Sequence, residues 1–147
     1  MEKKEFKITI NAPKEKVWEV LWDDASYPKW TSAFSEGSHA VSDNWKEGGK
    51  VLFLDGKGNG MVSIVEANKP SEFMSFKHLG DVKNGVEDTD SKEVSQWSGA
   101  HENYMLKETG GVTTLTVEMD ISDEYKDYFI NTFPPALEQV KILSENK

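Results

Sequence analysis

The chain has 147 residues, a net charge of −9 and no cysteine. Its length is that of one domain with its own core, which we expect to span residues 1–147. The lack of cysteine excludes disulfides, a thiol nucleophile and thiolate metal ligands, and it suits a reducing cytosol. Lysines are interleaved with acidic residues, so we find no basic patch for nucleic acid and expect no nucleic-acid partner.

The start of the chain, Met1 to Glu5, is charged and has no apolar segment behind it, so we expect no secretory signal. No apolar run approaches the roughly 20 residues that cross a bilayer, so we expect no membrane insertion. These features predict a soluble cytoplasmic protein. Aromatic residues are plentiful, with five Trp, seven Phe and four Tyr, and aromatic-rich interiors often line ligand pockets.

The first segments alternate between strand and helix patterns. Residues 5–10 alternate polar and apolar, which predicts a half-buried strand. After Pro13, apolar residues at helical spacing predict a short amphipathic helix over 13–22. Residues 27–34 predict a second short helix.

The middle of the chain has the pattern of an antiparallel meander. Four strand-like runs follow one another, each bounded by turn residues: 39–45, 50–54, 60–67 and 72–79. Residues 80–96 are polar and predict a long mobile loop. Residues 100–108 and 112–121, joined through Gly110 and Gly111, predict a hairpin.

The last segment predicts a long helix. Ser122 is a suitable capping residue and acids follow it, as at many helix starts. Apolar residues then recur at helical spacing as far as Leu143. Pro134 and Pro135 interrupt the pattern, so we expect a break or sharp kink near Phe133.

Four stretches of the sequence resemble the homologues of the activator of heat-shock-protein ATPase. They are 10–18 (INAPKEKVW), 27–30 (YPKW), 60–70 (GMVSIVEANKP) and 133–141 (FPPALEQVK). These homologues are a branch of the SRPBCC (START-like) superfamily, which includes birch-pollen-allergen-like proteins and polyketide cyclases. The resemblance covers nearly the whole chain, and its elements come in the family's order.

The resemblance implies an α+β helix-grip fold. In this fold a curved antiparallel sheet of about seven strands wraps around a long C-terminal helix, and two short helices lie between strands 1 and 2. An apolar cavity lies between sheet and helix. The superfamily includes lipid carriers, hormone receptors and cyclases. Its co-chaperone members carry a further domain before this one, so we do not expect chaperone activation.

We expect the ligand-binding residues on the concave face of the sheet, on the last helix and on the second short helix. The candidates are Trp30, Phe34, Phe53, Met61, Phe76, His78, Tyr104, Leu106, Val117, Met119, Tyr125, Phe129 and Phe133. Each of them alone is more often plain core, but a strongly curved sheet and one helix leave a gap that must be filled or occupied.

The sequence carries no catalytic motif, and we expect no metal and no cofactor. The three histidines are not spaced as metal ligands. His78 shares a strand face with Met74 and Phe76, where its polar tip could orient a ligand. Glu102 and Tyr104 share a face by period 2, as an acid–base pair in a cavity would, although a Glu on a strand more often faces solvent.

Three functions stay open. The leading hypothesis is binding of a small hydrophobic or amphipathic molecule, such as a lipid, a polyketide or an aromatic compound, with access gated by residues 80–96 and the hairpin ends. The second is a polyketide-cyclase-like enzyme that uses a cavity His, Tyr or Glu. The third is a protein-interaction, co-chaperone-like module, including a homodimer, which would use the sheet edge or an exposed Trp45 or Trp97.

Overall fold

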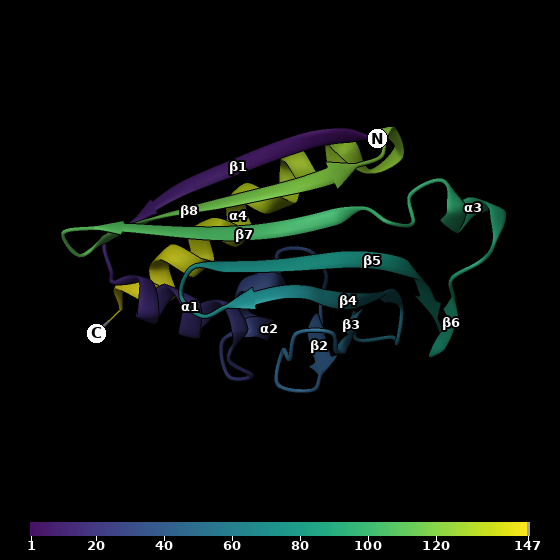
Figure 1. Cartoon of the computed structure of the whole chain (residues 1–147), viewed down its shortest axis with the longest axis horizontal. Helices are drawn as coiled ribbons and strands as arrows, with labels where there is room; N and C mark the ends of the chain where they lie inside the picture. Colours follow the sequence, from purple (N-terminus) through teal and green to yellow (C-terminus); the bar gives the residue numbers. More distant parts are fainter. Residues whose placement is uncertain (147) are drawn as a thin grey trace.

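The computed structural model describes residues 1–146, and within them eight strands form one sheet. Figure 1 shows the long helix α4 (Lys126–Glu145) lying along one face of this curved sheet. The spatial order of the strands is β1-β8-β7-β5-β4-β3-β2, with β6 paired to β5, and all pairs are antiparallel. The predicted helix-grip fold is therefore confirmed, with one strand more than expected.

The strands are β1 (Glu2–Ile10), β2 (His39–Ser42), β3 (Lys50–Leu54), β4 (Gly60–Lys69), β5 (Phe73–Lys83), β6 (Val86–Asp88), β7 (His101–Thr109) and β8 (Val112–Ile121). Two short helices, α1 (Lys14–Trp22) and α2 (Tyr27–Thr31), lie between β1 and β2 as predicted. A third, α3 (Lys92–Ser95), follows β6, and a 3-10 turn over Asp123–Tyr125 leads into α4. Strand β8 is buried at every second residue, from Thr113 to Ile121, which fits a strand with one face on the core.

The predicted mobile loop over 80–96 is wrong. Strand β5 continues to Lys83 and turns back into β6 through Asn84 and Gly85, which both have positive φ (50° and 80°). Asn-Gly is the preferred pair for such a two-residue hairpin turn, and this signal outweighs the polar composition of the segment. Ser91 then caps α3, because its hydroxyl accepts a hydrogen bond from the backbone N–H of Val94 (3.2 Å).

The predicted break near Phe133 is also wrong, because α4 runs through Pro134 and Pro135 without interruption. Both prolines are exposed, so water can bind the two helix carbonyls that lose their N–H partners, those of Ile130 and Asn131. On the other side of the helix, a buried row formed by Phe133, Ala136, Leu137 and Val140 packs in the core and holds the helix in place.

We expect Pro135→Ala to raise the free energy of unfolding by about 1–2 kcal/mol. The gain reflects the high cost of proline inside a helix, partly offset by the greater freedom that alanine gives the unfolded chain. Urea unfolding followed by tryptophan fluorescence measures it. Pro70→Ala, in the exposed turn between β4 and β5, is the control and should give no gain. A loss of stability in Pro135→Ala would contradict this account of α4.

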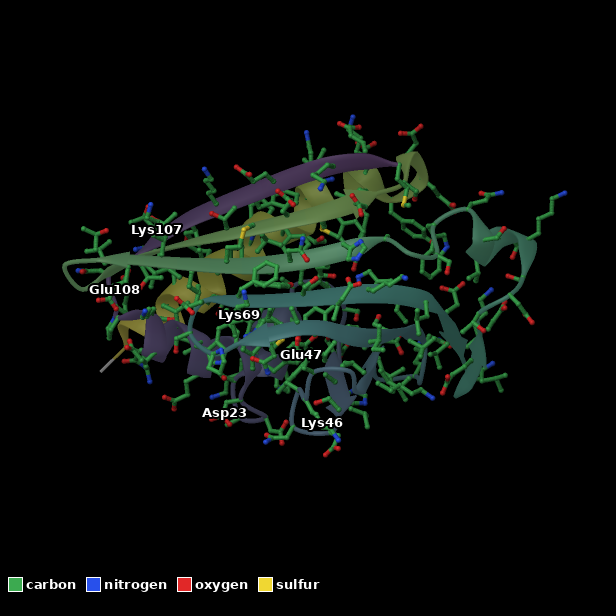
Figure 2. All side chains as sticks on the ribbon, in the orientation of Figure 1. Asp23, Lys46, Glu47, Lys69, Lys107 and Glu108 are labelled. Carbon is green, nitrogen blue, oxygen red and sulfur yellow. The ribbon has the colours of Figure 1, made fainter. Side chains whose placement is uncertain are left out.

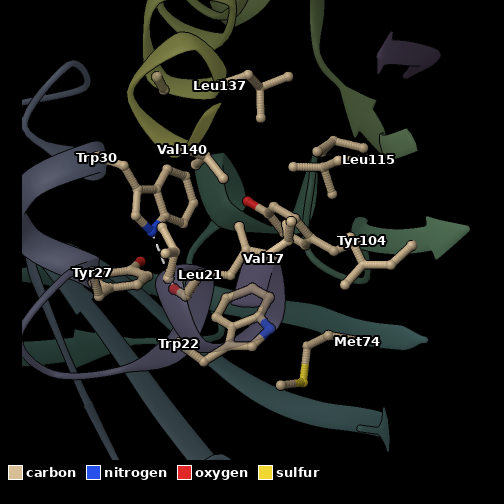
Figure 3. Packing of buried hydrophobic residues seen from close by; sticks show 14 of the residues in the cluster. Val17, Leu21, Trp22, Tyr27, Trp30, Met74, Tyr104, Leu115, Leu137 and Val140 are labelled. Carbon is tan, nitrogen blue, oxygen red and sulfur yellow. Dashed lines mark hydrogen bonds between the residues drawn. The ribbon is translucent and has the colours of Figure 1, made fainter. Parts of the chain in front are cut away.

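An aromatic cluster forms the core beneath α1 and α2 (Figure 3). Trp22 lies at its centre and contacts six other rings: Trp18, Tyr27, Trp30, Trp45, Phe76 and Tyr104. Trp45 is only 8% exposed, and its indole N–H donates to the carbonyl oxygen of Trp22 (2.7 Å). An exposed Trp45 was therefore a wrong prediction, and Trp97 is half-buried.

Charged side chains of both signs lie on the loops, turns and strand ends. The charged side chains labelled in Figure 2 are all exposed: Asp23, Lys46, Glu47, Lys69, Lys107 and Glu108. This mixed distribution is typical of a solvated surface. Within residues 1–146, no helix has the length and apolar character that crossing a membrane requires.

Candidate ligand-binding site

Two adjoining cavities lie between the sheet and the N-terminal half of α4. Cavity A has a volume of about 350 Å³ and is bounded by α2, the start of β4, β7 and α4. Cavity B has a volume of about 290 Å³ and is bounded by β4, β5, the end of β8 and α4. Four residues, Gly60, Met61, Tyr128 and Phe129, line both cavities and lie between them. Each cavity has the size of a small-ligand pocket.

Most of the predicted ligand-binding residues line these cavities. Met61 and Phe129 line both of them. Cavity A is also lined by Trp30, Phe34, Phe53, Tyr104 and Phe133. Cavity B is also lined by His78, Met119 and Tyr125. That these residues bind a ligand stays a prediction.

The other three candidates, Phe76, Leu106 and Val117, line neither cavity and lie in the hydrophobic core. They face the interior as their period-2 pattern predicts. However, Phe76 packs against Trp22 of α1, with 5.4 Å between ring centroids, and not against a cavity. The alternation identifies the face of a strand but not the position along it at which packing gives way to a cavity.

Several residues of the cavity walls were not among the expected ligand-binding residues. Tyr27 and Tyr128 line cavity A, and Trp97 lines cavity B. Glu102 also lines cavity A, and the strand face that it shares with Tyr104 in the sequence pattern is the signal that points to it.

Glycine is required at Gly60, where β3 and β4 approach each other on the wall of both cavities. A Cβ atom at this position would lie 1.7 Å from the carbonyl oxygen of Phe53, which no side chain can tolerate. The close approach of the two strands therefore shapes the boundary between cavities A and B.

A polar chain of hydrogen-bonded side chains runs across β4, β5 and β7 and connects the walls of the two cavities. The Nε2 atom of His78 lies 3.0 Å from Oε1 of Glu102, and the Tyr104 hydroxyl donates to Oε2 of the same carboxylate. A carboxylate only accepts hydrogen bonds, so Nε2 carries a proton. The Nδ1 atom of His78 can then accept from the Ser63 hydroxyl, 2.6 Å away.

Ser63, His78 and Glu102 are the residue types of a hydrolase triad, but their placement does not suit that chemistry. Ser63 is fully buried and lines neither cavity, so its hydroxyl cannot reach a substrate. His78 lines cavity B, whereas Glu102, its hydrogen-bond partner, lines cavity A. The arrangement therefore positions a carboxylate and a phenol on the wall of cavity A.

The two tyrosines near Glu102 stay protonated over a wide pH range. Burial, and after it the negative charge of Glu102, raises the pKa of Tyr27 well above its ordinary value. Burial raises the pKa of Tyr104 in the same way, and both the charge of Glu102 and the hydrogen bond to it add to the effect. Cavity A therefore presents neutral phenols beside a carboxylate. Within residues 1–146, no group of three or more acidic or histidine side chains is placed to hold a metal ion.

The sequence matches the family described as "Activator of Hsp90 ATPase homolog 1-like protein" over residues 11–128, most of its length. The chain belongs to this family. The match agrees with the resemblance seen in the sequence and places the chain in the corresponding branch of the SRPBCC superfamily. Among curated proteins, none matches its sequence.

Several proteins of known structure share this fold. The Aha1 dimer from Colwellia psychrerythraea is 18% identical, with a TM-score of 0.71 over 99% of this chain and 97% of that one. CalU16 from Micromonospora echinospora is 15% identical, with a TM-score of 0.66 over 97% of this chain and 74% of that one. DynU16, from the dynemicin biosynthetic locus, is 15% identical, with a TM-score of 0.70 over 99% of this chain. This chain spans 48% of DynU16, and identities this low establish the fold alone.

Proposed function

We propose that this protein binds a small hydrophobic or amphipathic molecule, such as a lipid, a polyketide or an aromatic compound, in cavities A and B. The observation that carries the proposal is the pair of adjoining cavities with mainly apolar walls and a few polar groups. Small-ligand sites have this composition, because apolar walls supply affinity and a few polar groups fix orientation. A fold relative from a biosynthetic locus, DynU16, supports a small molecule as the partner.

Access to the cavities would be controlled by two hairpin tips. Asp55 and Asn59, in the turn between β3 and β4, line cavity A, and Asp81, near the end of β5, lines cavity B. The two tips are joined by hydrogen bonds, from the Asn84 N–H to the Asn59 side chain (2.9 Å) and from the Gly85 N–H to the Gly58 carbonyl (3.1 Å). Separation of these tips would open both cavities together.

Native mass spectrometry of the purified protein, followed by solvent extraction, tests the proposal. We expect a stoichiometric bound compound of apolar or amphipathic character. A ligand-free mass, together with no thermal shift across a library of lipids and polyketides, would contradict the proposal. The same spectrum reports the oligomeric state, and a homodimer of this chain stays a prediction.

Met61→Trp is expected to reduce the bound fraction at least tenfold, because the larger ring fills space in both cavities. Ile64→Trp is the matched control. It lies on the same strand, is also half-buried and lines neither cavity, so it should retain the ligand. Equal ligand retention in the two variants would argue against binding in these cavities.

The polar chain favours acid–base catalysis as a second candidate function. Glu102 and Tyr104 are two titratable groups on one wall of cavity A, which an enzyme acting on the bound molecule would need. Comparison of the compounds extracted from wild type and from Glu102→Gln separates the two functions. An enzyme predicts a changed compound in the wild type only, whereas a carrier predicts the same compound in both.

A further inference from the structure

The charged groups around the two cavities are almost all acidic. Asp55 and Glu102 line cavity A, and Asp81 and Asp120 line cavity B. Among the described residues that line either cavity there is no lysine and no arginine, and His78 is the only basic side chain. A ligand in these cavities therefore meets carboxylates on the walls, whereas Lys57 and Lys83, whose charges act on Asp55 and Asp81, line neither cavity.

Glu102 is the acidic group most closely integrated into the cavity wall. Its side chain is only 14% exposed, and each oxygen takes part in one hydrogen bond, with His78 and with Tyr104. A carboxylate can accept about four hydrogen bonds. Glu102 therefore retains acceptor capacity on the wall of cavity A, where a bound molecule can reach it.

A second polar group of cavity A points to the same ligand chemistry. Tyr27 is 7% exposed and its side chain lines the cavity. The charge of Glu102 acts on the Tyr27 hydroxyl and, together with burial, raises the pKa of Tyr27, so the phenol stays neutral. A carboxylate accepts a hydrogen bond from either a hydroxyl or an amine of a ligand. A neutral phenol can accept from the same group, or it can donate to a ligand hydroxyl.

We infer that the ligand is an apolar molecule whose polar end donates a hydrogen bond and carries no negative charge, that is, an alcohol or an amine rather than a carboxylate or a phosphate. This inference rests on the proposed function and specifies its ligand class. An anionic head would be buried beside Glu102 without a counter-ion, and like charges at such short range disfavour binding strongly. An alcohol or an ammonium group instead supplies the donor that Glu102 can accept.

Three probes with the same chain length test the inference: decylamine, decan-1-ol and decanoate, each at neutral pH and below its micelle concentration. Their dissociation constants are measured by displacement of N-phenyl-1-naphthylamine from the protein. We expect decylamine and decan-1-ol to bind at least about tenfold more tightly than decanoate. In Glu102→Gln, which keeps an acceptor for Tyr104, decanoate is expected to come within about threefold of decan-1-ol.

Glu66→Gln is the matched control, because it removes the same charge from an exposed side chain that lines neither cavity. Its preference should equal that of the wild type. If decanoate binds wild type as tightly as the alcohol, the inference fails and the proposed function survives. If none of the three probes binds, the proposed function fails with it. If Glu66→Gln changes the preference as much as Glu102→Gln, the selectivity comes from net charge and the assignment to Glu102 is wrong.

Discussion

Trp30→Ala is expected to lower the free energy of unfolding by about 3–5 kcal/mol, a large part of the 5–15 kcal/mol typical of a domain. Trp30 is 1% exposed and packs against Tyr27, with 5.4 Å between ring centroids. Its indole N–H donates to the Leu21 carbonyl oxygen (3.1 Å), which joins α2 to α1 (Figure 3). The substitution removes the ring and leaves that buried carbonyl without its donor. Urea unfolding followed by circular dichroism measures the loss.

Two control variants separate the contributions of Trp30. Trp30→Phe keeps most of the ring but loses the hydrogen bond to Leu21, and it should cost about 1–2 kcal/mol. Trp97→Ala makes the same truncation at a half-buried residue outside the core cluster, so its cost should be clearly smaller. A cost for Trp97→Ala equal to that of Trp30→Ala would contradict the assignment of Trp30 to the core.

Stability is expected to fall steeply above about pH 10, by about 1.4 kcal/mol per pH unit for each of the two buried phenols. Burial raises the pKa of Tyr27 and of Tyr104 well above 10.0, with a further rise from the charge of Glu102. Above pH 10 the unfolded chain releases these two protons while the folded protein keeps them. Each phenol therefore contributes stability below its ordinary pKa, and this stability is lost as the pH rises towards the folded-state pKa.

Urea unfolding at a series of pH values from about 9 to 11 measures this slope. Tyr104→Phe should remove about half of it, because Phe does not ionise. Tyr125→Phe is the control, since Tyr125 is 47% exposed, and its removal should change the slope less. The account would be wrong if Tyr104→Phe left the slope unchanged, since Tyr104 would then ionise in the folded protein as it does in the unfolded chain.

Regular alternation and clear turn residues made parts of the sheet predictable from the sequence. The expected strands over 50–54 and 112–121 have the bounds of β3 and β8. The expected loop over 80–96 failed because its overall polarity was given more weight than the Asn84-Gly85 turn signal. The expected break in α4 failed because local proline chemistry was weighed without the buried residues that hold the helix on the core.

The site was predictable to a smaller degree, for a geometric reason. Period 2 placed His78 and Tyr104 on the inner face, where both are buried. It could not show that Trp22 of α1 packs against Phe76, which lies in the core and lines neither cavity. Nor could it show that Ser63 is paired across β4 and β5 with His78, since a strand register depends on the whole sheet.

The most direct test of ligand binding in cavities A and B uses the methionine methyl groups as reporters. Met61 lines both cavities and Met119 lines cavity B, whereas Met74 and Met105 line neither. In a titration of methyl-¹³C-methionine protein with N-phenyl-1-naphthylamine, we expect saturable shifts of the Met61 and Met119 signals and nearly constant signals for Met74 and Met105. Saturable binding that shifts Met105 or Met74 and leaves Met61 unchanged would contradict it.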